Sequence, residues 1–595
     1  MTNNGGCART AGRDRAMRDP GGKGEGMLDD QKTGAGAAQD AEDAAARDAG
    51  QAWWRGAALY QIYPRSFADS DGDGTGDLPG IIAHLDHVAS LGVDAIWVSP
   101  FFRSPMADFG YDVSDYREVD PIFGTLADFD RLVAEAHRRG LRVIIDQVMS
   151  HTSDQHRWFQ ESRQSRDNPR ADWYVWADPA PDGTPPNNWL SIFGGSAWQW
   201  EPRRGQYYLH NFLVSQPDLN YHNPAVAAQM LEECEFWLQR GVDGFRLDAI
   251  NFCFHDPLLR SNPAKPPELR KGRGFSVDNP YAAQVHLYDN TRPEMLGFLE
   301  RLRAVIDRYP QTMTLGEIAS EDSIATVGEY TAGDARLHSA YCFELLVERF
   351  SAAHVREVIE SLERRSPGYW PTWAIGNHDV ARVASRWACP GVPTAARARL
   401  LNAFLLSLKG TTCTYQGEEL GLTEAELPLE ALKDPYGIAF WPNFKGRDGC
   451  RTPMPWTDDA PQGGFTAGAP WLPMPAEHRA QAVARQSADP TSTLNAFRAF
   501  MRFRRAQPAL RLGSMRFLDA PAEALCFLRE HQGRTLLAAF NFGAAPVTVT
   551  LPAGAAVTPL AGHGFDPCMP AGGRVTLPAA GAFFANLAPG GSTRS

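Results

Sequence analysis

From residue 59 onward, short runs of hydrophobic positions alternate with longer stretches in which hydrophobic positions recur with helical spacing. The short runs predict buried strands, and the amphipathic stretches predict helices that cover them. The expected strands are 59–63, 95–98, 142–146, 244–250, 312–318, 337–345, 370–376 and 411–415. The expected helices are 81–91, 127–139, 225–240, 294–308, a short one after 318, 353–364, 396–408 and 494–505. This alternation predicts an α/β fold, an eight-stranded β/α (TIM) barrel.

Two segments interrupt the alternation. Residues 151–221 are rich in Trp, Pro, Asn and Gly and too long for an ordinary loop, so they predict a subdomain inserted after the third strand. Residues 421–490 form a second long excursion. The pattern therefore predicts a barrel made of 53–150 and 222–510, with the inserted subdomain between the two parts.

The two ends of the chain differ from the barrel. After residue 511, short alternating strands with Gly/Pro turns predict a C-terminal antiparallel β-domain, 511–595. Its expected strands are 515–518, 524–528, 536–542, 547–551, 575–577 and 583–587. Residues 1–52, rich in Gly, Ala, Asp and Arg, predict a disordered extension.

Composition narrows the class of protein. The net charge of −12 argues against a nucleic-acid partner, whose binding needs a basic face. No apolar run is long enough to span a bilayer, and the first residues lack the apolar core of a secretory signal. The nine cysteines are scattered without a CxxC pair, as in reduced thiols. We therefore expect a cytoplasmic enzyme, a monomer or homodimer, that acts on a small molecule without nucleic acid or membrane.

The ends of the expected strands carry the chemistry. In the segment 244–248, Arg246 and Asp248 point to the same face of a strand, and a charged pair in an apolar strand is costly unless each partner satisfies the other. Taken alone, this pair is equally well explained as a structural ion pair. Further polar residues follow other strands, namely 146–151, Glu317 and 377–379. Because catalysis in a β/α barrel occurs at the carboxyl ends of the strands, these side chains are expected to share one opening.

Paired carboxylates suit glycosidic cleavage, in which one acts as nucleophile and the other as acid and then base. The sequence resembles glycoside hydrolase family 13, the α-amylase superfamily, within its branch of bacterial α-glucosidases and oligo-1,6-glucosidases. The resemblance extends from about residue 53 to the end. It rests on ordered motifs at 61–67, 146–151, 216–220, 244–248, 316–317, 377–379 and 415–419.

The resemblance implies a role for each matched residue. Asp248 would be the nucleophile that forms a β-glucosyl-enzyme, and Arg246 would orient it and keep it ionised. Glu317 would be the general acid/base and must carry a proton at neutral pH. Asp379 would bind the 2- and 3-hydroxyls of the glucose and distort its ring towards the transition state.

Further residues would surround the same glucose. His151 and His378 would hold other hydroxyls, and Tyr111 would either stack beneath the ring or belong to the core. Asp108 and Arg447 resemble the pair that caps the 4-hydroxyl and closes the pocket, and the nearby Arg451 is the alternative to Arg447. A closed pocket admits only a terminal glucose, so the resemblance implies exo-action.

The segment 69–77 carries a second group of acids. Asp69, Asp71, Asp73 and Asp77, with Thr75 between them, follow the ligand spacing of an EF-hand loop, although position 12 is Gly80 and a strand precedes the loop. The alternative is a cluster of turns, but close carboxylates repel one another without a cation. The resemblance implies a structural Ca²⁺ or Mg²⁺ here.

Two positions bear on specificity. Ser150 stands where many members of the family have an Asn that binds calcium in α-amylases, which argues against that calcium site. Ala249 stands where a Val in relatives goes with α-1,6 cleavage, so Ala249 favours α-1,4 links. The segment 274–280 either shapes the leaving-group site or is an ordinary loop.

The leading expectation is a retaining exo-α-glucosidase that prefers maltose-like substrates and can transfer glucose to acceptors other than water. The alternatives are an oligo-1,6-glucosidase and a sucrose-acting glucosyltransferase or isomerase of the same family. A transporter-associated barrel without activity fits less well, because Asp248, Glu317 and Asp379 are all present.

Overall fold

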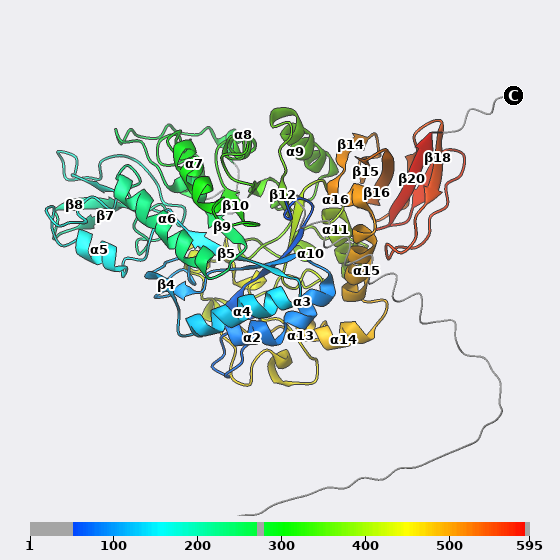
Figure 1. Cartoon of the computed structure of the whole chain (residues 1–595), viewed down its shortest axis with the longest axis horizontal. Coiled ribbons are helices and arrows are strands. Elements are labelled where there is room, and N and C mark those ends of the chain that lie inside the picture. Colours follow the sequence, from blue (N-terminus) through cyan, green and yellow to red (C-terminus); the bar gives the residue numbers. More distant parts are fainter. Residues whose placement is uncertain (1–51, 271–278, 590–595) are drawn as a thin grey trace, which may run out of the picture. The chain divides into compact units, whose positions relative to one another are not determined.

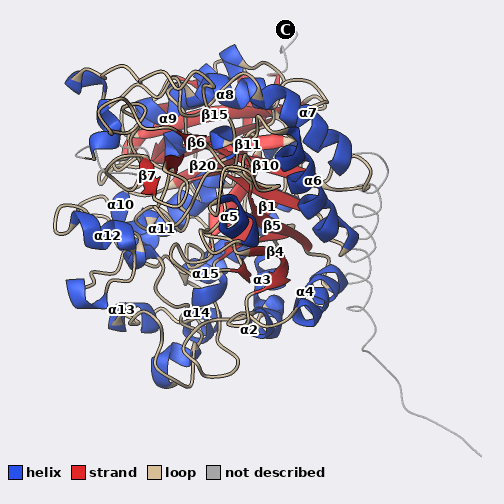
Figure 2. Cartoon of the chain, turned by 90° about the vertical axis from the view of Figure 1, so that its left-hand side faces the viewer, coloured by secondary structure: helices blue, strands red, loops and turns tan. Residues whose placement is uncertain are grey.

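The computed structural model describes residues 52–270 and 279–589, and every element below belongs to one compact unit, Trp54–Ser595. Its central sheet has eight parallel strands in the order β11-β10-β9-β5-β2-β1-β13-β12. They are β1 (Ala58–Ile62), β2 (Ala95–Val98), β5 (Arg142–Val148), β9 (Gly244–Asp248), β10 (Met313–Ile318), β11 (Ser339–Cys342), β12 (Thr372–Ala374) and β13 (Thr411–Tyr415). Helices lie outside these strands (Figures 1 and 2). The predicted β/α barrel is confirmed.

Side chains close the barrel between its sixth and seventh strands. Within the described residues, no backbone ladder joins β11 to β12. Instead, Ser339 Oγ lies 2.8 Å from both Trp370 O and Thr372 Oγ1, and Tyr369 Oη accepts from Ala340 N at 3.1 Å. We call this junction the seam. Of the eight barrel strands, β11 and β12 thus have a ladder on one side only.

The helices begin where the sequence supplies capping groups. Helix α4 has a capping box, in which Thr125 accepts from Asp128 N while Asp128 reaches back to Thr125 N. Asn223 caps α6, and Ser492 caps α15. The helices of the barrel layer are α2 (Leu78–Ala83), α3 (Leu85–Leu91), α4 (Leu126–Arg138), α6 (Pro224–Gln239), α7 (Met295–Ile306), α8 (Ser323–Tyr330), α9 (Ala352–Arg365), α10 (Val383–Arg386), α11 (Thr394–Leu405) and α15 (Thr493–Arg505).

The long interruptions carry structure of their own. The segment 151–221 contains α5 (Arg157–Ser162) and a three-stranded sheet of β6 (Trp176–Ala177), β7 (Trp198–Glu201) and β8 (Gln206–Leu209). The segment 421–490 contains α12 (Pro435–Phe440), α13 (Ala476–Arg479) and α14 (Val483–Ala488). A hairpin that the pattern did not predict, β3 (Phe102–Arg103) and β4 (Asp115–Val119), follows β2.

The C-terminal strands form separate antiparallel sheets, orange to red in Figure 1. After α16 (Pro508–Leu512) come β14 (Ser514–Leu518), β15 (Ala524–His531), β16 (Arg534–Asn541), β17 (Val547–Thr550), β18 (Ala555–Pro559), β19 (Arg574–Leu577) and β20 (Ala582–Pro589). Phe584 of β20 packs on Phe500 and Phe503 of α15, with ring centroids 5.5 and 5.2 Å apart. An apolar core is therefore shared between barrel and C-terminal sheet.

Some predicted boundaries differ from the structure. The expected strand 337–345 is the shorter β11 followed by a 3₁₀ turn, Phe343–Leu345, and β18 was not predicted. The expected disordered extension lies outside the described residues, apart from residue 52. No helix in the described part of the chain combines the length and apolarity needed to cross a bilayer.

Candidate active site

Arg246 is the centre of the site. It lies on β9 with no exposed surface, and its Nη1 donates to Asp248 Oδ1 at 2.6 Å and to Asp146 Oδ1 at 2.8 Å. Its Nη2 pairs with Glu317 Oε1. These acids come from the neighbouring strands β5, β9 and β10, so parallel register brings three carboxylates to one guanidinium.

Glu317 is held by three donors. Besides Arg246, the hydroxyl of Tyr341 donates to Oε1 at 2.7 Å. The backbone N–H of Ala249 donates to Oε2 at 3.2 Å. Ala249 has φ 39° and ψ 43°, a left-handed conformation that turns this N–H towards β10.

The charges of this group do not cancel, because three carboxylates surround one guanidinium. Burial raises the pKa of Asp248 well above its ordinary value, and although Arg246 opposes this, Glu317 and Asp146 add to the rise. Burial also raises the pKa of Asp146 to about 6 against the effect of Arg246. Arg246 therefore lowers the pKa of Asp248, but burial and the two neighbouring carboxylates outweigh its effect.

Asp379 is the opposite case. Burial would raise its pKa, but His378, Arg447 and Arg451 outweigh burial and hold the pKa below its ordinary range. Arg451 Nη2 donates to Asp379 Oδ1 at 2.9 Å, and Arg447 Nη1 reaches the same oxygen at 3.3 Å. Asp379 is thus a fixed anion across the cavity from the Arg246 group.

His378 lies behind the cavity wall. It is fully buried, with Nδ1 2.7 Å from Gln61 Nε2 and Nε2 2.6 Å from Tyr111 Oη, and its ring stacks on that of Tyr111. Burial lowers its pKa to about 3, so the ring is neutral. In the structure its ring contacts Tyr111 and Asp379. The expected contact of His378 with sugar hydroxyls stays a prediction.

One end of the cavity is closed by an ion pair. Arg447 Nη2 donates to Asp108 Oδ1 and to Asp434 Oδ1, each at 2.8 Å. Gln216 Nε2 lies 3.2 Å from Asp108 Oδ2 and 3.1 Å from His151 Nε2. The predicted partner of Asp108 is therefore Arg447, while Arg451 contacts Asp379.

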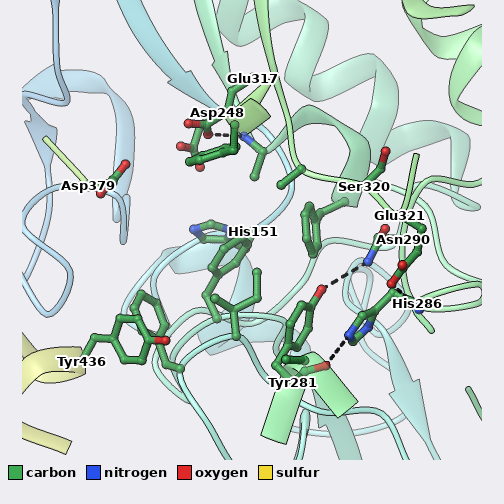
Figure 3. Close-up of a pocket in the computed structure, with 18 of the residues that line it drawn as sticks. His151, Asp248, Tyr281, His286, Asn290, Glu317, Ser320, Glu321, Asp379 and Tyr436 are labelled. Atoms are coloured by element: carbon green, nitrogen blue, oxygen red, sulfur yellow. Dashed lines mark hydrogen bonds between the residues drawn. The ribbon is translucent and has the colours of Figure 1, made fainter. Parts of the chain in front are cut away.

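These groups line a cavity of about 420 Å³ (Figure 3). Seven of the predicted residues line it, and Arg246 and His378 lie behind its wall. The seven are Asp108, Tyr111, His151, Asp248, Glu317, Asp379 and Arg447. Figure 3 shows Asp248 together with Glu317, and Asp379 apart from them. Polar groups therefore converge on one end of a cavity large enough for a small ligand.

Part of the cavity lining was not predicted. It includes the aromatic side chains Phe193, Phe212 and Phe252, and also Tyr281 and His286, which stack with ring centroids 3.6 Å apart. No pattern in the sequence marked these aromatic residues. Of the segment 274–280, the structure describes only 279 and 280.

Asn279 connects two further parts of this wall. It donates to Tyr436 Oη at 3.0 Å and to Ile192 O at 2.7 Å, both from residues of the cavity lining. Ser150, the departure from the family pattern, lies 2.9 Å from His151 Nδ1 and has no exposed surface. Its hydroxyl therefore positions the imidazole of a cavity residue.

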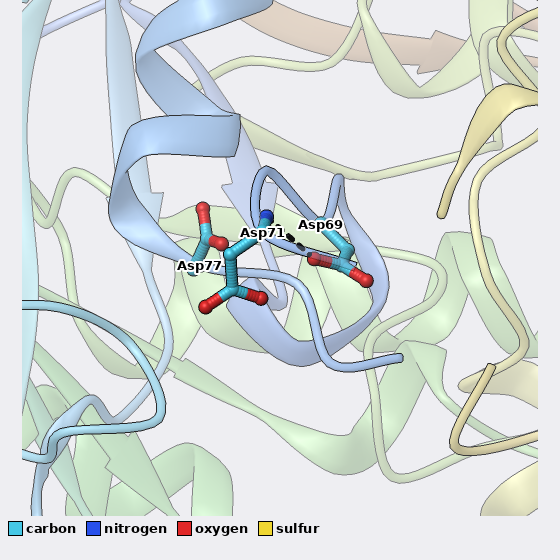
Figure 4. A group of neighbouring side chains, drawn as sticks. All are labelled: Asp69, Asp71 and Asp77. Carbon is cyan, nitrogen blue, oxygen red and sulfur yellow. Dashed lines mark hydrogen bonds between the residues drawn. The ribbon is translucent and has the colours of Figure 1, made fainter. Parts of the chain in front are cut away.

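The predicted metal loop gathers three of its five residues (Figure 4). Carboxylate oxygens of Asp69, Asp71 and Asp77 lie within 4.8 Å of one another. Asp73 lies outside this trio, and its carboxylate accepts from Thr75 N at 2.7 Å. An all-oxygen donor set fits a hard cation such as Ca²⁺ or Mg²⁺. None of these residues lines the cavity.

Comparisons with known proteins agree with this geometry. The model of the α-amylase catalytic domain matches residues 61–513. A probable α-glucosidase of Rhizobium meliloti (strain 1021) is 57% identical over 538 residues, 90% of this chain and 97% of that protein. An oligo-1,6-glucosidase of Heyndrickxia coagulans is 37% identical over 541 residues, 84% of this chain and 94% of that protein.

A solved structure is also similar over most of the chain. The crystal structure of the α-glucosyl transfer enzyme XgtA superposes with a TM-score of 0.89 at 61% identity, covering 91% of this chain and 100% of that one. Fold and site thus define a β/α-barrel glycoside hydrolase. The chain belongs to the α-amylase family, among relatives named α-glucosidase and oligo-1,6-glucosidase.

Proposed function

We propose that this protein is a retaining, exo-acting α-glucosidase that releases α-glucose from the non-reducing ends of short α-glucosides. The observation that carries the proposal is the convergence of Asp248, Glu317 and Asp379 on one cavity. Asp248 and Glu317 share Arg246, while Asp379 has its own cations. Two carboxyl groups in one network can divide the roles of nucleophile and acid.

The reaction has two steps. Glu317 donates its proton to the glycosidic oxygen as the bond between that oxygen and C1 breaks, and the Asp248 carboxylate forms an ester bond to C1. Glu317 then takes a proton from water, whose oxygen displaces Asp248 and leaves α-glucose. Burial raises the pKa of Asp248, whereas the reaction needs Asp248 ionised and the proton on Glu317, so substrate binding must favour that distribution of the proton.

The closed end of the cavity supports exo-action. Asp108 and Arg447 are buried, paired at 2.8 Å, and both line the cavity. Charged groups with remaining hydrogen-bonding capacity recognise a terminal hydroxyl well, and a second sugar beyond them would have to break a buried ion pair. We infer that this pair binds the 4-hydroxyl of the terminal glucose.

We propose a preference for α-1,4 links on the basis of Ala249. This residue lines the cavity next to the nucleophile, and its small side chain leaves room for the leaving sugar. The competing function is that of an oligo-1,6-glucosidase, which the likeness to the Heyndrickxia coagulans enzyme favours. Relative rates on maltose and isomaltose separate the two.

Transfer of glucose to other acceptors is part of the proposal. A covalent intermediate can react with any hydroxyl that enters before water does. The likeness to an α-glucosyl transfer enzyme supports this reaction. A sucrose-acting transferase or isomerase remains the further alternative, because it would use the same intermediate.

We also propose a structural Ca²⁺ or Mg²⁺ held by Asp69, Asp71 and Asp77, since their oxygens are close enough to share one ion. We infer a cytoplasmic location, which the free state of all eight cysteines in the described part of the chain supports. A monomer or homodimer is the proposed assembly.

One experiment tests the main points. The purified enzyme is incubated with maltose, isomaltose and sucrose, and the first products are followed by NMR. We expect α-glucose as the first anomer, with maltose consumed fastest. β-Glucose as the first product would overturn retention. Preferred cleavage of isomaltose would favour the competing function, and sucrose isomers as main products would favour the further alternative.

A further inference from the structure

Tyr341 occupies a defined place beside Glu317. It lies on β11, and the parallel register of β10 and β11 pairs Glu317 directly with Tyr341. The phenol is buried, and its oxygen lies between the guanidinium of Arg246 and the carboxylate of Glu317. The register of two strands therefore sets this contact.

The direction of the hydrogen bonds at this hydroxyl follows from chemistry. Arg246 Nε lies 3.2 Å and Nη2 3.0 Å from Tyr341 Oη, and a guanidinium can only donate. The phenol oxygen accepts both bonds, so its single O–H is committed to Glu317 Oε1 at 2.7 Å. Burial raises the pKa of the phenol well above its ordinary value although Arg246 opposes this, so the proton stays in place.

The two oxygens of Glu317 consequently differ. Oε1 receives the Tyr341 hydroxyl and Arg246 Nη2, whereas among the described residues Oε2 receives only the N–H of Ala249 at 3.2 Å. A proton on Oε1 would face two donors at close range. The Oε2 oxygen keeps a free lone pair, on a side chain that lines the cavity.

We propose that Tyr341 is a positioning residue that confines the catalytic proton of Glu317 to Oε2. This inference rests on the proposed function, in which Glu317 is the acid/base. Tyr341 is not among the residues that line the cavity, and it acts through the Glu317 carboxyl that it orients. Without the hydroxyl, Arg246 Nη2 is the one described donor left to keep the proton off Oε1, so the proton occupies Oε1 more often and is less often available on Oε2.

The test is Tyr341→Phe, compared on two substrates. Maltose has a poor leaving group that needs the proton, and α-glucosyl fluoride has one that needs little protonic help. We expect kcat/KM on maltose to fall about tenfold to a hundredfold, as for a lost hydrogen bond to a charged group. On the fluoride we expect a fall of less than about threefold.

The pH profile supplies a second measurement. The Tyr341 hydroxyl stabilises the ionised carboxylate of Glu317, so its removal favours the protonated form. We expect the alkaline limb of kcat/KM on maltose to move to higher pH, by up to about one unit. Equal losses on both substrates, with an unmoved alkaline limb, would show a purely structural role and overturn the inference.

Two controls separate the possible failures. Tyr330→Phe removes another buried tyrosine hydroxyl, one with no hydrogen-bond partner among the residues that the structure describes, and is expected to change neither rate nor pH profile. Glu317→Gln is expected to lose maltose turnover far more than fluoride turnover. If Glu317→Gln shows no such difference, the acid/base assignment itself fails. If it does and Tyr341→Phe does not, only the role of Tyr341 fails.

Discussion

Two groups of acids in this molecule have different surroundings. At the barrel mouth, Asp146, Asp248 and Glu317 surround the buried guanidinium of Arg246. In the first loop, no cationic side chain of the described residues lies within hydrogen-bonding distance of the trio of Asp69, Asp71 and Asp77. The donors recorded for Asp69 and Asp77 are backbone N–H groups and the hydroxyls of Ser70 and Thr466.

The difference teaches what each group can do. Arg246 fixes the mouth group in place but supplies one positive charge to three carboxylates, so the pKa values of Asp146 and Asp248 are raised. The loop group is more exposed and has oxygen donors that a metal ion can share. A carboxylate lost from the mouth should therefore affect rate, and one lost from the loop should affect stability.

The largest effect is expected from Asp248→Asn. The amide keeps the size of the side chain but cannot form an ester with C1, so kcat on an aryl α-glucoside should fall more than about a thousandfold. The melting temperature, measured by calorimetry, should not fall. Asp71→Asn is the matched control in the loop, with unchanged kcat. Turnover near the wild-type level in Asp248→Asn would remove the nucleophile assignment.

The second effect is on stability, from Asp146→Asn. Its folded pKa of about 6 lies above the unfolded value near 3.9, so its contribution to stability is complete below about pH 4 and is lost as the pH rises through 6. An Asn cannot ionise. The variant should therefore gain about 1–3 kcal/mol of unfolding free energy at pH 7.5 relative to pH 4.

Denaturant unfolding at the two pH values measures this gain. The comparison is always with the wild type at the same pH, so that other titrating groups cancel. An Asp146→Asn variant with the same relative stability at both pH values would contradict the raised pKa. Its activity should be lower, because Arg246 loses one of the acids that hold it in position.

The third effect concerns the loop. If Asp69, Asp71 and Asp77 share an ion, calcium binds the folded state only and stabilises it by about 3 kcal/mol at a hundred times its dissociation constant. We expect calcium to raise the melting temperature of the wild type by a few degrees. In Asp69→Asn this response should disappear while kcat stays unchanged. An equal response in both proteins would place the ion elsewhere.

The smallest effect is expected from Asp73→Asn. The EF-hand spacing made Asp73 a ligand, whereas the structure leaves it outside the trio, with its carboxylate bound to Thr75 N. We expect a change in stability below about 0.5 kcal/mol and an intact response to calcium. If Asp73→Asn lost the response to calcium as Asp69→Asn is expected to, Asp73 would be a metal ligand, as the EF-hand spacing predicted.

Much of the active site was predictable from the sequence, because the carboxyl ends of all strands in a β/α barrel lie at the same opening. Asp248, Glu317 and Asp379 lie far apart in the chain, yet each follows or ends an apolar run, and all three line one cavity. The choice between Arg447 and Arg451 was not decidable in the same way. Both lie in an irregular segment, and only folding shows that Arg447 contacts Asp108 and Arg451 contacts Asp379.

Other features left no local signal. Tyr341 looks like a strand residue, and only the register of β11 with β10 gives it Glu317 as a partner. Asp434 lies outside every motif, but its carboxylate accepts hydrogen bonds from the guanidinium of Arg447 and from the backbone N–H of Arg447. The short strands of the hairpin β3–β4 lack clear alternation. The hydrophobic pattern predicts helices and strands that have one regularly apolar face. It does not predict contacts that depend on how distant strands pair.

The seam has a consequence for local motion. Since β11 lacks a ladder on the side facing β12, its amides have fewer bonds to break before they meet solvent. Deuterium should therefore enter β11 and β12 sooner than β1 or β2, whose ladders run on both sides. The two strands at the seam, one of which carries Tyr341, are thus expected to open locally more often than the other strands of the barrel.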